Sequence, residues 1–371
     1  MKRTIFSFLF TAMLLITQSS NVYPQSWTLN QIINAAISNS YELKSLSDNI
    51  NAGRGLRQQA DVPLNPQIGT TIGNVTQEIE FSQEFEYPGK REARIGVADE
   101  QLEIEKIKYR LAKVILQKKI ASIFYGILYD QKIIELYEGN LNMSRDFLNE
   151  VKNKFNMGYT GRVNLIKARI EVLRAKRLLN SAIQKEVSNK VNLRIMIGAD
   201  TASNFEIKGN LLEPIFNFSL SIDSLLKIAY KNSPLLLLHK HSETEAKYEL
   251  NKTILSSKPN FNIGIVGGIE DREKAFALNF QMPLSLWDTK EGAKTDALFK
   301  LKSSDNQLKN VYKIVEQQVT TSYNEYITNY NNLKLFRDSL LEESKNTVNL
   351  AQEAFKKGSL NLLELIDAQR T

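Results

Sequence analysis

Apolar and acidic side chains alternate along one short segment, which reads IEFSQEFEY from residue 79. The apolar positions share one parity: Ile79, Phe81, Phe85 and Tyr87. The other parity carries Ser82 and three carboxylates: Glu80, Glu84 and Glu86. Because successive strand residues point to opposite faces of a sheet, the pattern predicts a strand with one apolar face and one acidic face. Pro88 and Gly89 end this strand, and a basic, helix-forming run follows.

The chain contains the same pattern twice. TLNQIINAAISNSYEL from residue 28 resembles SIDSLLKIAYKNSPLL from residue 221, and FNMGYTGRVNLIKA from residue 155 resembles FKKGSLNLLELIDA from residue 355. A second alternating segment, FALNFQMPLSLW from residue 276, replaces the first one in the later copy. Three matches in the same order predict a tandem duplication. We expect one repeat at 25–198 and the other at 220–371, joined by a linker at 199–219.

Each repeat is predicted to hold the same elements in the same order. Short amphipathic helices at 29–39 and 222–232 each precede a longer helix and two strands. The strands are expected at 67–73, 77–87, 260–269 and 275–286. Proline-free helices at 92–157 and 292–357 follow, and about 65 residues form a rod on the order of 100 Å long. Gly158 and Gly358 are placed to end these rods in a left-handed conformation, and a further helix is expected at 163–197.

Apolar residues lie on two flanks of the first long helix, in rows that begin at Ile107 and Ile120. A two-stranded coiled coil needs a single apolar seam, so two flanks favour a wall or barrel of helices. A stalk of two coiled-coil hairpins is the alternative. The strands have the length and alternation of membrane β-barrel strands or of a half-buried soluble sheet. Since a closed membrane barrel needs at least about eight strands, several chains would have to share one.

The N-terminus has the features of an export signal at 1–24. Lys2 and Arg3 precede an apolar run from Ile5 to Ile16, which is too short to cross a bilayer of about 30 Å as a helix. Cleavage is expected near Pro24 or Gln25. The 371-residue chain has no cysteine, which excludes disulfides and thiolate metal sites.

Composition and motifs argue against nucleic-acid binding and catalysis. The formal charge is +7, but Lys and Glu are interleaved, as on solvated helix faces. Phosphate-binding and nucleophile motifs are absent from the sequence. His239 and His241 diverge on a helix, so a shared metal site is not expected. We expect no enzyme activity, no cofactor and no bound metal.

The quoted segments, with QEFEYPGKREAR and FKKGSLNLLELIDAQRT, resemble the TolC-type outer-membrane efflux protein family over 27–371. The YPGKR run is more similar to the heavy-metal cation efflux branch. The resemblance implies a mainly α fold with a small β part: a homotrimer with a twelve-stranded outer-membrane β-barrel and a periplasmic α-barrel. It implies partnership with a periplasmic adaptor and an inner-membrane transporter. Family members continue the last helix and usually add a tail, whereas this sequence stops at Thr371, so we expect either a truncated second repeat or a clipped last helix.

The resemblance also suggests roles for particular residues. Glu80, Glu84 and Glu86 are pore-lining candidates, while Phe81, Phe85, Tyr87 and Trp287 would face outer-membrane lipid or its interface. Glu364 and Asp367 match acidic positions of the periplasmic gate, and the turns at Gly158 and Gly358 would dock the adaptor. Efflux of organic compounds, type I secretion, and a coiled-coil adaptor or stalk remain alternatives.

Overall fold

A computed structural model describes residues 25–198, 205–211, 221–270, 273–360, 364–365 and 367–368. The predicted export signal and most of the predicted linker lie outside these residues. The chain divides into two compact units, one comprising residues up to 40 with 115–215, the other comprising 41–114 with 216 onward. Within the described residues, every helix is too short or too polar to cross a membrane.

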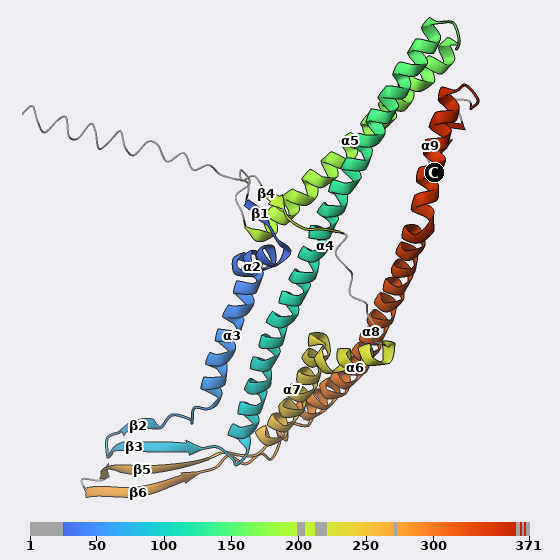
Figure 1. Cartoon of the computed structure of the whole chain (residues 1–371). Helices are drawn as coiled ribbons and strands as arrows, with labels where there is room; N and C mark the ends of the chain where they lie inside the picture. Colours follow the sequence, from blue (N-terminus) through green and yellow to red (C-terminus); the bar gives the residue numbers. More distant parts are fainter. Residues whose placement is uncertain are drawn as a thin grey trace, which may run out of the picture. The chain divides into compact units, whose positions relative to one another are not determined.

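The order of elements occurs twice along the chain (Figure 1). The first series is α2 (Leu29–Asn39), α3 (Tyr41–Ala60), β2 (Gln67–Ile72), β3 (Thr76–Phe85) and α4 (Lys90–Asn156). The second is α6 (Ile222–Asn232), α7 (Pro234–Ser256), β5 (Phe261–Glu270), β6 (Glu273–Gln281) and α8 (Glu291–Leu335). The remaining elements are β1 (Gln25–Trp27), α5 (Arg162–Ile197), β4 (Phe205–Ile207), a π-helical turn (Phe336–Leu340) and α9 (Leu341–Lys356).

The helix starts follow from capping residues. Thr28 Oγ1 accepts a hydrogen bond from the backbone N–H of Gln31, whose side chain accepts one from the Thr28 N–H, so α2 begins with a capping box. Ser221 and Ser233 cap α6 and α7 through their hydroxyl oxygens. The two short helices have the predicted bounds, and α4 and α5 agree with prediction within two residues at each end.

Two predictions about elements were wrong, and one pair of strands was not predicted. The strand expected to reach residue 286 ends at Gln281, just before Pro283, which has no N–H to donate to a neighbouring strand. The second rod is interrupted by the π-helical turn, although it contains neither proline nor glycine there. The pair β1 and β4 was missed, because three-residue strands leave no measurable alternation.

The first unit has a core where α2 meets α4 and α5. Ile32 and Ala36 of α2 are buried with residues of the other two helices: Ile120, Phe124, Ile127, Leu128, Leu193 and Ile197. Parallel strands β1 and β4 lie beside this core. Asn39 Nδ2 donates to the carbonyl oxygen of Ile197 at 2.6 Å, which satisfies a free carbonyl at the end of α5.

The second unit contains the larger sheet and the packing of α7 on α8. Leu236 of α7 is buried against Val311 and Val315 of α8. The sheet has the order β2-β3-β5-β6, with every neighbouring pair antiparallel (Figure 1). Among the described strands, β2 and β6 each have one partner, so each leaves one edge of the sheet unpaired.

Candidate functional site

One face of the four-stranded sheet is apolar and exposed to solvent. The register pairs Phe81 with Ile265 and Ile265 with Leu278, so these three side chains share that face. Together they belong to an apolar face defined by eleven exposed residues: Ile68, Ile72, Ile79, Phe81, Phe85, Ile263, Ile265, Ile269, Phe276, Leu278 and Phe280. An apolar surface of this extent on a sheet marks contact with lipid or another protein.

The opposite face of the sheet is acidic and lined by small residues. It carries Glu78, Glu80, Ser82, Glu84, Gly69, Gly264, Gly268, Asn262, Ala275, Ala277 and Asn279. We call these residues the polar face. A Cβ atom at Gly264 would lie 2.8 Å from Oε1 of Glu80, so glycine leaves the space that this carboxylate occupies.

Glu80 and Glu84 are each held by a neutral amide. Asn279 Nδ2 donates to Glu80 Oε1 at 2.9 Å, and Asn260 Nδ2 donates to Glu84 Oε1 at 2.8 Å. A hydrogen bond from an amide orients a carboxylate and leaves its negative charge in place. The structure therefore brings these two predicted residues together on one face, with fixed side chains.

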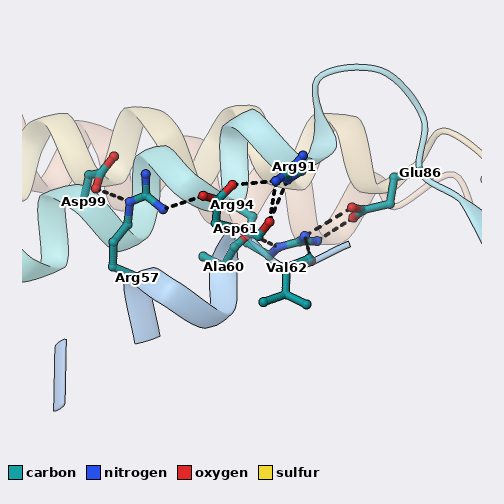
Figure 2. Close-up of polar contacts among 8 residues, drawn as sticks. All are labelled: Arg57, Ala60, Asp61, Val62, Glu86, Arg91, Arg94 and Asp99. Atoms are coloured by element: carbon teal, nitrogen blue, oxygen red, sulfur yellow. Dashed lines mark hydrogen bonds and ion pairs between the residues drawn. The ribbon is translucent and has the colours of Figure 1, made fainter. Parts of the chain in front are cut away.

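Glu86 has a different environment, because it lies one residue beyond β3 and forms an ion pair with an arginine. Its carboxylate accepts hydrogen bonds from Arg94 of α4 at 2.5 and 3.1 Å, as Figure 2 shows. The Glu86 side chain is only 15% exposed. A bidentate pair of this kind balances the carboxylate charge. Of the three carboxylates singled out in the sequence, this one contributes least to the charge of the polar face.

Three arginines tie the end of α3 to the start of α4 (Figure 2). Arg94 also donates to the carbonyl oxygens of Ala60 and Val62. Arg91 donates to the carbonyl and carboxylate oxygens of Asp61, while Arg57 pairs with Asp99. The last carbonyls of a helix have no partner within it, and here arginine side chains supply the donors.

Lys90 lies at the same junction and contacts the asparagine that holds Glu84. Its Nζ donates to Asn260 Oδ1 at 2.7 Å. Burial lowers the pKa of the Lys90 amine below its ordinary value, although the negative charges of Glu86 and Glu84 oppose this shift. The buried Oδ1 atom of Asn262, which pairs with Glu84 across the strands, has no donor among the described residues.

The two predicted turns have matching geometry. Gly158 and Gly358 have φ angles of +80° and +79°, which glycine adopts at little cost. In each turn the glycine N–H bonds back to Phe155 or Phe355, and the next residue bonds to a carbonyl five positions earlier. This Schellman pattern confirms the predicted helix ends. A Cβ atom at either glycine would meet no described atom within 4 Å.

Other candidates from the sequence are not brought together as a site. Glu364 and Asp367 are both exposed. His241 Nδ1 lies 2.7 Å from Glu100 Oε2, and the described residues contain no group of three side chains that could hold a metal ion. Sequence reasoning missed Arg94 and Asn260 as partners of the carboxylates, and Lys90 as a partner of Asn260. The i, i+3 spacing puts Arg91 and Arg94 on one face of a helix, which could have indicated a contact with acidic groups. Nothing in the sequence around Asn260 marks it as a partner.

A family model described as outer membrane efflux protein matches residues 32–199. Among curated proteins, the cobalt-zinc-cadmium resistance protein CzcC of Cupriavidus metallidurans is 22% identical over 353 residues, covering 93% of this chain and 83% of that protein. The match spans both repeats of the chain.

Solved structures with similar folds include three outer-membrane proteins. The outer membrane protein VceC from Vibrio cholerae has a TM-score of 0.78 at 12% identity, covering 92% of this chain and 89% of that chain. CusC has a TM-score of 0.72 at 13% identity, covering 95% and 89%. The CmeC outer membrane channel of Campylobacter jejuni has a TM-score of 0.71 at 13% identity, covering 92% and 79%.

Proposed function

The chain belongs to the outer membrane efflux protein family, the TolC family of channels, and from this premise we propose that three copies form the exit duct of a tripartite efflux pump. Its place is the outer membrane, with a helical extension in the periplasm, and it is a transporter without enzymatic activity. In the proposed duct, four strands from each copy close one twelve-stranded barrel. A periplasmic adaptor and an inner-membrane transporter deliver the substrate.

The observation that carries this proposal is the sheet with one exposed apolar face and two edges that have no partner among the described strands. An open sheet edge cannot lie in hydrocarbon, because its backbone N–H and C=O groups would have no partners. Pairing of β6 from one copy with β2 from the next removes both edges. The apolar face then meets lipid and the polar face lines an aqueous pore.

Three sets of residues have proposed roles in the duct. Glu80 and Glu84 supply a negative potential inside the pore, which raises the local concentration of cations. Glu364 and Asp367 form the acidic ring of the periplasmic gate. The turns at Gly158 and Gly358 dock the adaptor, since each ends the helical stretch that follows a pair of strands in its repeat.

We propose heavy-metal cations as the substrate class. The supporting observations are the acidic polar face and the similarity to a protein named for cobalt, zinc and cadmium resistance. Carboxylate and amide oxygens favour the passage of cations over anions. The same duct architecture also suits organic compounds, so substrate class needs a direct test.

Two experiments test the proposal in order. Membrane fractionation and native mass spectrometry of the purified protein should give an outer-membrane trimer, and a periplasmic monomer would contradict the duct. The gene is then deleted, and tolerance to cobalt, zinc and cadmium is compared with tolerance to detergents and dyes. Loss of metal tolerance alone supports the cation assignment, and loss of dye tolerance alone contradicts it.

A further inference from the structure

The amine of Lys90 lies at the base of the polar face, where β3 passes into α4. Through Asn260 it is linked to Glu84: the amine donates to Asn260 Oδ1 at 2.7 Å, and Asn260 Nδ2 donates to Glu84 Oε1 at 2.8 Å. Lys90 also sits within electrostatic range of Glu86. One asparagine thus holds a cation and an anion in fixed positions on opposite sides of its amide group.

We propose that Lys90 is a tethered counter-ion of the polar face, which sets how strongly the pore selects cations. The proposal rests on the proposed function, since it requires the polar face to line a pore. Glu86 is already balanced by Arg94, so Lys90 offsets the charge of Glu84. Glu80, which has an amide partner on β6, keeps its full effect on passing ions.

Two observations make Lys90 more than an ordinary surface lysine. It is partly buried, and its pKa is lowered by desolvation, so the amine is held among protein atoms at a cost in hydration. Its contact is to the neutral Asn260, so the carboxylate of Glu84 remains available to another cation. Removal of the amine leaves the Glu84 carboxylate and its Asn260 amide without this neighbouring positive charge.

The second repeat provides a matched comparison at the same strand-to-helix passage. Lys290 immediately precedes α8, but its Nζ pairs with Asp288 in the connecting segment. The backbone N–H and the Nζ of Lys290 both donate to the carboxylate of Asp288. The two lysines therefore lie at equivalent positions, and within the described parts of the chain Lys90 is linked to a carboxylate of the sheet whereas Lys290 is held by Asp288.

The test compares Lys90→Met with Lys290→Met in purified protein reconstituted in planar bilayers. The readout is the permeability ratio of potassium to chloride, taken from reversal potentials in a salt gradient. We expect Lys90→Met to raise this ratio about two- to fivefold at low ionic strength. The effect should be smaller at high ionic strength, because dissolved salt screens the field of the Lys90 amine. Lys290→Met should leave it near the wild-type value, and Lys90→Arg, which keeps the charge, should do the same.

Further variants separate the possible failures. Glu84→Gln combined with Lys90→Met should bring the ratio back toward wild type. An unchanged ratio in Lys90→Met, or an equal rise in Lys290→Met, overturns the proposal for Lys90 while the channel itself stands. If wild-type protein forms no pore, or if Glu80→Gln and Glu84→Gln also leave the ratio unchanged, the proposed pore face fails, and Lys90 loses its role with it.

Discussion

Glu86 accepts two hydrogen bonds from the guanidinium group of Arg94, at 2.5 and 3.1 Å. The pair connects the residue that follows β3 with the first turns of α4, across the bend at Pro88 and Gly89. Arg94 also binds two carbonyl oxygens at the end of α3. One side chain therefore joins three elements at the point where the sheet becomes helical.

We predict that Arg94→Ala destabilises the folded protein by about 1–3 kcal/mol, because it leaves Glu86 and two backbone carbonyls without their donors. The urea midpoint of protein refolded into lipid vesicles measures this loss. Lys132→Ala is the control, since Lys132 and Glu135 are 64% and 70% exposed and such pairs contribute about 0–1 kcal/mol. Equal shifts in the two variants would remove the junction from any special role in stability.

Replacement of the carboxylates should reveal that they are not equivalent. Glu80→Gln and Glu84→Gln each remove a charge held by a neutral amide, so we expect both to lower potassium-over-chloride selectivity. Glu86→Gln combined with Arg94→Gln removes a pair that is neutral as a whole, so we expect this double variant to change selectivity less. Reversal potentials provide the measurement. A larger effect from this double variant than from either single change would contradict the pairing seen in the structure.

The glycine turns should be required for docking rather than for folding. Gly158→Val with Gly358→Val places β-branched residues at φ angles near +80°, at a cost of about 1–2 kcal/mol per turn. We expect normal membrane insertion and trimer formation, with loss of adaptor cross-linking and of efflux-dependent resistance.

Gly161→Val is the matched control for these turns. Gly161 belongs to the same loop as Gly158, but its φ of −84° suits any residue, and a Cβ atom there meets no described atom within 4 Å. It should retain cross-linking. Full cross-linking by the double glycine variant would direct attention to the sides of the helices instead.

Alkaline titration should increase cation selectivity. The Lys90 amine has a lowered pKa, so it loses its proton before an ordinary lysine as pH rises. The charged groups around this amine are Glu84 and Glu86, and Arg94 pairs with Glu86. Loss of the positive charge therefore leaves the polar face more negative. As the pH is raised, we expect the permeability ratio to start increasing before pH 10.5, the ordinary pKa of a lysine amine. This increase should be absent in Lys90→Met.

The lowered pKa of Lys90 also predicts how the stability of the folded protein changes with pH. Between the lowered pKa of folded Lys90 and its ordinary value of 10.5, the unfolded chain binds more protons than the folded one. Stability attributable to this group therefore increases with pH in that window. The urea midpoint of the wild type minus that of Lys90→Met should therefore increase as pH rises through this window. All other lysines are present in both proteins, so their contributions cancel in the difference. An opposite slope would show that the amine is stabilised in its charged form.

Periodicity in the sequence was enough to find most elements and the two faces of the sheet. The alternation from Ile79 to Tyr87 assigned each side chain to a face, because side-chain direction in a strand has a fixed period. Gly158 and Gly358 were found for a similar reason, since a left-handed helix end is a local property of the backbone. The tandem repeat strengthened each local assignment, because the same order of elements was predicted in both copies.

Only the tertiary structure decided which charges on that sheet are balanced. Asn260 lies far in sequence from both Glu84 and Lys90, and nothing in its neighbourhood marks it as their partner. The parity of the strand pattern grouped Glu86 with Glu80. In the structure, Arg94 of α4 pairs with Glu86, whereas Glu80 accepts a hydrogen bond from the neutral amide of Asn279. Strand periodicity fixes the direction of a side chain, but its electrostatic environment depends on elements that come from elsewhere in the chain.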